Sequence, residues 1–105
     1  MTVPQYGLYM SGNGRKVVAA ASTAEQLSTT SVPCRWVYMT ALASCSGIVV
    51  AGVSTVVATA SSRAGVALSG GQSVLIPVSD LNALYLDVTV AGEGISYAYF
   101  NHTTP

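Results

Sequence analysis

The chain has 105 residues, of which half are hydrophobic and only 8% are charged, and its four basic and four acidic residues give a formal net charge of zero. This length predicts one domain spanning residues 1–105, able to bury a core without metal or disulfide support, and the absence of net charge argues against binding to nucleic acid or to an anionic membrane. Because soluble domains usually carry about a quarter charged residues, so few charges predict a surface that is largely covered by protein partners.

The N-terminal segment shows no secretory signal, since Met1–Gln5 lacks a basic region followed by a long apolar stretch. We therefore expect intracellular synthesis. An apolar stretch follows at residues 6–10, and residues 11–14 separate it from the later strands. Residues 1–14 are predicted to form an arm that reaches a neighbouring subunit. Residues 11–16 superficially resemble a glycine-rich phosphate loop, but they lack the Walker spacing and a following helix, so a turn is predicted.

Four strands are predicted in the first half of the chain. Two short ones cover residues 16–21 and 25–28. Residues 34–42 are apolar on both faces, which is typical of a central strand. After a turn at residues 44–47, a strand at 48–51 is expected to pair with the central one.

The twenty residues from 41 to 60 carry no charge and could be compared with a membrane span. Serine, threonine and glycine divide them into short β-branched pieces, and the flanking basic and aromatic anchors of a span are missing. We expect strands here and no membrane contact.

Two hairpins are predicted in the second half. Residues 66–68 turn through 69–72, where the Gly70-Gly71 pair supplies the positive φ of a tight turn, into 74–78. Pro77 cannot donate to a ladder, which predicts a sheet edge. Residues 84–90 alternate aliphatic and other side chains with period two, and a glycine-bearing connection joins them to 95–100 as a C-terminal hairpin.

The count reaches about eight short strands with turn signals between them and no long window of helical period. This pattern predicts an all-β protein, an antiparallel β-sandwich of jelly-roll type.

Residues that could support catalysis or metal binding are sparse. Cys34 and Cys45 lack metal-type spacing, so small buried or half-buried thiols are expected, with a disulfide across a hairpin as the alternative. His102 lies near the C-terminus, a poor place for a rigid catalytic base. The carboxylates share no motif and are expected to be turn or surface groups: Glu25, Asp80, Asp87 and Glu93. We expect no enzyme, no metal and no cofactor.

The aromatic residues admit two interpretations. They could form a sugar-binding platform, but cross-strand packing and subunit contact are the favoured roles of alternating tyrosines. The predicted protein-contact residues are Tyr6, Leu8, Tyr9, Trp36, Tyr38, Tyr97 and Tyr99.

Residues 24–100 also carry a family resemblance. The segments involved are Ala24–Ser28, Val32–Val37, Gly47–Gly52, Gly65–Gly71, Asp80–Asp87 and Gly92–Tyr97. In their order they resemble small virion-associated proteins of tailed bacteriophages. The resemblance implies a capsid cement or decoration protein, commonly trimeric, that binds the major capsid protein on the outside of the shell. Related modules occur in fibres and baseplates, so the alternative expectation is an adhesion module that binds a host glycan.

Overall fold

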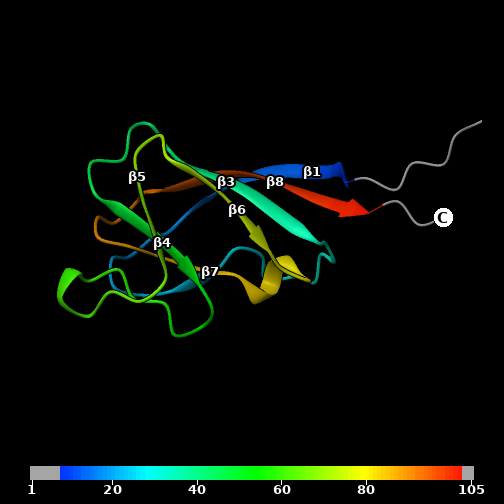
Figure 1. The fold of residues 1–105 in the computed structure, drawn as a ribbon. Helices are drawn as coiled ribbons and strands as arrows, with labels where there is room; N and C mark the ends of the chain where they lie inside the picture. Colours follow the sequence, from blue (N-terminus) through cyan, green and yellow to red (C-terminus); the bar gives the residue numbers. More distant parts are fainter. Residues whose placement is uncertain (1–7, 103–105) are drawn as a thin grey trace, which may run out of the picture.

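The computed structural model describes residues 8–102, which form eight strands and two short 3-10 helices (Figure 1). The strands are β1 (Leu8–Val17), β2 (Glu25–Gln26), β3 (Trp36–Ala41), β4 (Ile48–Gly52), β5 (Val66–Ser69), β6 (Ser73–Pro77), β7 (Tyr85–Val88) and β8 (Gly94–His102). The helices are η1 (Ala60–Ser62) and η2 (Leu81–Ala83). The predicted all-β class and the expected number of strands are confirmed.

The strands form two antiparallel sheets of four strands each. Sheet A has the order β1-β8-β3-β6, and sheet B has the order β2-β7-β4-β5. Both sheets contribute to one cluster of buried side chains, among them Val37 and Met39 from sheet A and Val49, Leu86 and Val88 from sheet B. The core therefore lies between the two sheets, and the predicted sandwich is confirmed.

Strand β3 shows why the sequence specifies a central strand here. Its odd-numbered residues Val37, Met39 and Ala41 are completely buried, whereas Tyr38 is exposed. The strand lies inside sheet A between β8 and β6. Pro77 ends β6, which is an edge strand of sheet A, so both predictions are confirmed.

The predicted hairpins are wrong. Strand β7 pairs with β2 and β4, while β8 pairs with β1 and β3, so the residues between them cross from one sheet to the other. Strands β5 and β6 are also in different sheets, although the turn between them is confirmed by the Gln72 N–H, which donates to the Ser69 carbonyl over 2.9 Å. Strand β4 pairs with β5 and β7 and not with β3. A short connection can form a hairpin within one sheet or cross to the other sheet. Here the crossing is favoured because it buries the inner faces of both sheets against each other.

The predicted turn at residues 11–16 is also wrong, because these residues lie in β1, which pairs with β8 from Leu8 to Val17 (Figure 1). Residues 8–14 of the expected arm thus belong to the sheet of their own chain. The two glycines in this stretch lie beneath aromatic rings: a Cβ on Gly14 would approach the Tyr97 hydroxyl to 2.7 Å, and the Tyr99 ring covers Gly12. Residues 1–7 of the arm lie outside the described residues.

The outer face of sheet B is covered by the connection between β4 and β5. Val56 and Ala58 from this connection pack on Val50, with Ile48 and Tyr85 at the margin. The connection is closed by a bridge at residues 57 and 64. Within residues 8–102, no helix is long and apolar enough to cross a membrane.

Candidate functional site

Among residues 8–102, no connection covers the outer face of sheet A in the same way. The register of the four strands and the alternating burial along them assign these side chains to it: Met10, Asn13, Arg15 and Val17 from β1, Ser96, Ala98 and Phe100 from β8, Trp36, Tyr38 and Thr40 from β3, and Ser73, Leu75 and Pro77 from β6. Arg15 is the single charged residue among these thirteen. Several large apolar side chains here are exposed, including Met10 at 61%, Tyr38 at 46% and Leu75 at 45%.

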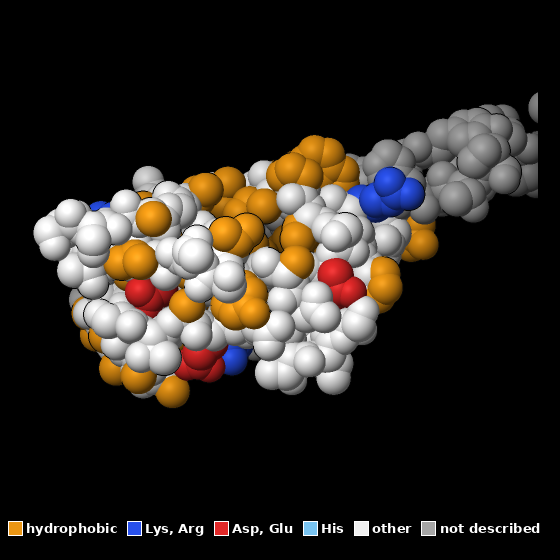
Figure 2. All heavy atoms as spheres, turned by 90° about the horizontal axis from the view of Figure 1, so that it is seen from below, with side chains coloured by type: hydrophobic (Ala, Val, Ile, Leu, Met, Phe, Trp, Pro, Cys, Tyr) orange, Lys and Arg blue, Asp and Glu red, His pale blue; other side chains and the backbone are white. Residues whose placement is uncertain are grey.

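One row of residues across this face is entirely apolar. The register places Phe100 beside Trp36 on one side and Met10 on the other. Trp36 in turn lies beside Pro77, and Leu75 follows on the same face of β6. We call Met10, Trp36, Leu75, Pro77 and Phe100 the apolar patch. Figure 2 shows the molecule from below the view of Figure 1, where separate acidic and basic side chains stand among hydrophobic and uncharged ones.

The predicted contact residues separate into three groups. Trp36 and Tyr38 lie on the outer face of sheet A. Tyr97 and Tyr99 have the opposite parity on β8 and pack against the core, above the glycines of β1. Their rings are therefore directed into the sandwich, and we leave them out of the candidate site.

The remaining contact residues lie at the start of the chain. Tyr9 is 49% exposed and stands opposite Asn101, next to an irregularity in β1 between Met10 and Gly12. Leu8 is the first residue of β1, and Tyr6 lies outside the described residues.

Sequence reasoning did not identify four residues of the apolar patch as contact residues: Met10, Leu75, Pro77 and Phe100. The signal that could have found Phe100 is the alternation along β8, because Tyr97 and Tyr99 share one parity and Ala98 and Phe100 share the other. The sequence does not show which of these two sets faces the core, so the tyrosines were predicted as contact residues and the phenylalanine was not.

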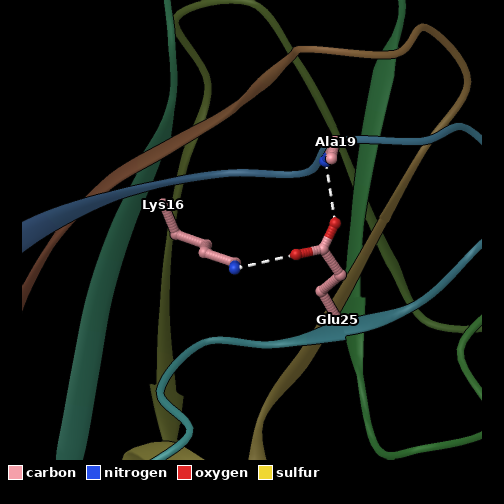
Figure 3. A network of polar contacts seen from close by, with 3 residues as sticks. All are labelled: Lys16, Ala19 and Glu25. Atoms are coloured by element: carbon pink, nitrogen blue, oxygen red, sulfur yellow. Dashed lines mark hydrogen bonds and ion pairs between the residues drawn. The ribbon is translucent and has the colours of Figure 1, made fainter.

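The four carboxylates of the chain all bind backbone N–H groups of another segment. Glu25 on β2 accepts from the Lys16 ammonium over 2.9 Å and from the Ala19 N–H over 2.7 Å, which ties the two sheets together (Figure 3). Glu93 accepts from the N–H groups of Ser46 and Gly47 over 2.7 and 3.0 Å.

The two aspartates act in the same way. Asp80 caps η2 through the Asn82 N–H and also accepts from the Val32 N–H, each over 2.9 Å. Asp87 is buried and accepts from the Ala58 N–H over 2.8 Å. The predicted turn role of Asp80 is confirmed, whereas the burial of Asp87 was not expected.

Hydrogen bonding lowers three of these pKa values. The pKa of Glu25 is lowered chiefly by the Lys16 hydrogen bond, that of Asp80 by the Ser31 hydroxyl, and that of Glu93 by the Ser46 N–H. These groups are therefore held in the ionised form, in which they accept the hydrogen bonds of the loops.

Both cysteines are free thiols, Cys34 buried and Cys45 half-buried, as expected. Burial is the main cause that raises the pKa of the Cys34 thiol, and the Asp80 charge adds to it. A raised pKa disfavours the reactive thiolate. Among residues 8–102, no three His, Cys, Asp or Glu side chains are grouped as a metal site would require.

Comparison with models of protein families, with curated proteins and with solved structures finds no match to this chain. The outer face of sheet A is therefore interpreted from its own chemistry.

Proposed function

We propose that this protein is a structural component of a phage particle, a cement or decoration protein that binds the major capsid protein on the outside of the shell. The proposal rests on the resemblance of residues 24–100 to small virion-associated proteins and on the chemistry of the outer face of sheet A. In this role the protein acts as a homotrimer and needs no cofactor, nucleic acid or membrane.

We also infer that the sandwich is a jelly roll. Two features support this: the chain passes between the sheets at most of its connections, and the first and last strands, β1 and β8, are neighbours in sheet A. The strand orders 1-8-3-6 and 2-7-4-5 are those expected when a paired ribbon of strands is wrapped into two sheets. Jelly rolls occur in viral capsid and lectin domains, which is compatible with the proposed role but does not by itself imply it.

The apolar patch is the observation that carries the proposal. Its five side chains are contiguous by register and uncharged, and the chain's own connections cover the other sheet instead. An aromatic and aliphatic centre with few charges is the composition of a protein-contact surface. Docking this surface on the shell removes apolar area from water, which contributes about 25 cal/mol per Å² before the costs of association.

The role of the carboxylates supports a structural function over catalysis. Each of the four has a hydrogen-bonding role in fixing a loop or joining the sheets. A general acid or base needs a group that is free to exchange protons with a substrate. We therefore assign no catalytic residue.

The test uses shells assembled without this protein, to which the purified protein is added back. Leu75→Lys places a charge in the apolar patch and is expected to weaken co-sedimentation with the shells at least tenfold. Val66→Lys, on edge strand β5 of sheet B, is the matched control, because Val66 is 44% exposed and Leu75 is 45% exposed. Circular dichroism verifies that both variants fold.

The wild-type protein and Val66→Lys are expected to bind the shells and to raise the temperature at which packaged DNA is released. If the wild-type protein fails to bind, or if the release temperature is the same with and without it, the proposed function is wrong.

A further inference from the structure

A groove lies beside the apolar patch on the outer face of sheet A. The register places Ala98 of β8 between Tyr38 of β3 and Asn13 of β1. Because alanine is much shorter than its two neighbours, the surface is hollowed above it. The next outward residue of β8, Ser96, extends this floor beside Thr40.

The hollow has a volume of about 300 Å³ and is lined by Met10, Asn13, Gly14, Tyr38, Thr40, Ser96, Tyr97 and Ala98. None of these residues carries a formal charge. Its size lies at the lower end of the range for small-molecule sites, about 300–1,000 Å³. The groove can therefore hold a small ligand against an aromatic wall.

The polar side chains of the groove have unused hydrogen-bonding capacity. Within residues 8–102, neither Asn13 nor Ser96 forms a side-chain hydrogen bond, and the nearby bonds join Thr40 to Ser73 and Asn101 to Ser11. The Asn13 side-chain amide supplies two N–H donors and one acceptor oxygen. Each hydroxyl supplies one donor and two acceptor positions. These groups can bind a ligand that is itself rich in hydroxyls.

We propose that this groove binds a neutral saccharide, with the C–H face of a sugar ring stacked on Tyr38. The ring hydroxyls exchange hydrogen bonds with Asn13, Thr40 and Ser96. A purely apolar ligand would leave these polar groups without partners, which is costly when water is displaced. An ionic ligand would find no opposite charge in the lining.

Binding here is expected to be weak. The hollow is shallow and formed by few side chains, so a single sugar ring buries only part of its surface. Dissociation constants in the millimolar range, about −4 kcal/mol, are appropriate for such a contact.

The inference does not rest on the proposed function. Met10 belongs to both the groove and the apolar patch, and Leu75 of the patch stands opposite Tyr38 of the groove. Pro77 stands opposite Trp36, and neither residue lines the groove. Pro77→Lys therefore changes the patch without changing the groove or the partner of Tyr38.

The experiment is saturation-transfer NMR on the full chain with methyl glycosides of glucose, galactose, mannose and N-acetylglucosamine, together with their disaccharides. We expect transfer to at least one of these sugars, and we expect at least a fivefold loss of affinity for Tyr38→Ala and for Asn13→Ala. Ala98→Leu fills the floor and is expected to abolish binding while all polar groups remain. Pro77→Lys is the control that keeps binding, because Pro77 stands opposite Trp36, outside the lining of the groove.

Two results overturn the inference: no transfer to any neutral sugar, or transfer that survives Ala98→Leu. Glucuronic acid is included as an acidic probe, and binding confined to it also overturns the neutral assignment and directs attention to Arg15. If the wild-type protein binds sugar but not the shells, only the proposed function is contradicted. If it binds the shells but no neutral sugar, only this inference is contradicted.

Discussion

Asp87 is the only buried charged side chain within residues 8–102, and it lies on the outer side of sheet B. The connection between β4 and β5 covers it there. Its carboxylate accepts from the Ala58 N–H over 2.8 Å and from the Val88 N–H over 2.9 Å. A buried carboxylate is tolerated when hydrogen bonds replace its water. Asp87 thus anchors the connection between β4 and β5, which covers the outer face of sheet B.

We predict that Asp87→Ala lowers the free energy of unfolding by about 1–3 kcal/mol, because the Ala58 N–H loses its acceptor in a buried place. Urea unfolding measures the change. Thr89→Ala is the control, since Thr89 accepts from the Ile48 N–H over 2.9 Å at an exposed position where water replaces the bond. Equal losses for the two variants would contradict an anchoring role for Asp87.

Gly94 is a second position where one residue determines local packing. It begins β8, and a Cβ there would collide with the Lys16 carbonyl oxygen and approach the Val17 Cα to 2.7 Å. Both obstacles are backbone atoms of the neighbouring strand. The close approach of β1 and β8 at this point therefore requires glycine.

Gly94→Ala is expected to destabilise the protein by at least about 1–3 kcal/mol, the range for overpacking, because a strand must move. At Gly14 the obstacle is the far end of the Tyr97 side chain, which can rotate. Gly14→Ala should therefore cost clearly less in the same urea experiment. A smaller loss for Gly94→Ala than for Gly14→Ala would show that the strand contact is not as tight as described.

At the scale of elements, the connection from β7 to β8 is held by Glu93. This carboxylate accepts from the Ser46 and Gly47 N–H groups, which lie just before β4. The same connection bonds to the end of β1 through the Val18 N–H, which donates to the Glu93 carbonyl over 2.9 Å. A single turn therefore joins sheet A to sheet B at this end of the sandwich.

This arrangement predicts a loss of stability in acid. The folded pKa values of Glu25, Asp80 and Glu93 are lowered from ordinary values of 4.5, 3.8 and 4.5. Their contribution is fully present above those ordinary values and is lost as the pH falls through the lower folded values. The melting temperature should be level from neutral pH to about 5 and should fall below about 4.5.

Glu93→Gln separates this effect from general acid unfolding. The variant should melt at a lower temperature at neutral pH and should show a smaller decrease between pH 5 and pH 3 than the wild-type protein, when both are followed by circular dichroism. A decrease of the same size in the two proteins would exclude Glu93 as a source of the acid sensitivity.

The elements also show what the sequence can and cannot predict. The apolar side chains on both faces of residues 34–42 were sufficient to predict β3 as a central strand. The partner of each strand was not predictable from local pattern. Residues 70–72 and 89–93 have the glycines of hairpin turns, yet both connections cross between sheets, and that choice depends on which faces are buried together.

The candidate site was predictable only in part for the same reason. Trp36 and Tyr38 were identified by residue type, and the structure places them on the outer face of sheet A. Phe100 and Leu75 join them only through cross-strand register, which brings together residues far apart in the sequence. Tyr97 and Tyr99 were chosen for the same chemistry but have the parity that faces the core.

At the scale of the whole molecule, one edge of sheet A is open. The Val18 N–H donates to the Glu93 carbonyl, and the Val18 carbonyl accepts from the Gly92 N–H, both in the connection that leads into β8. Because backbone groups alternate in direction along an antiparallel strand, those of Asn13, Arg15 and Val17 point away from β8. Within residues 8–102 no backbone group of another element pairs with them. An unpaired strand edge of this length favours pairing with another chain.

We predict that the purified protein is a trimer by light scattering over a range of concentrations. The resemblance implies this state, and a closed ring of three head-to-tail contacts would cover the open edge of β1 in every copy. Arg15→Pro removes a backbone N–H that faces away from β8, at an edge position where proline is tolerated. It should therefore lower the measured mass to that of a monomer while the circular dichroism spectrum stays unchanged.

Arg15→Gln, which removes the charge but keeps the N–H, should remain trimeric. A wild-type protein that is monomeric at all concentrations would contradict the trimer, and a trimer that survives Arg15→Pro would place the contact away from this edge.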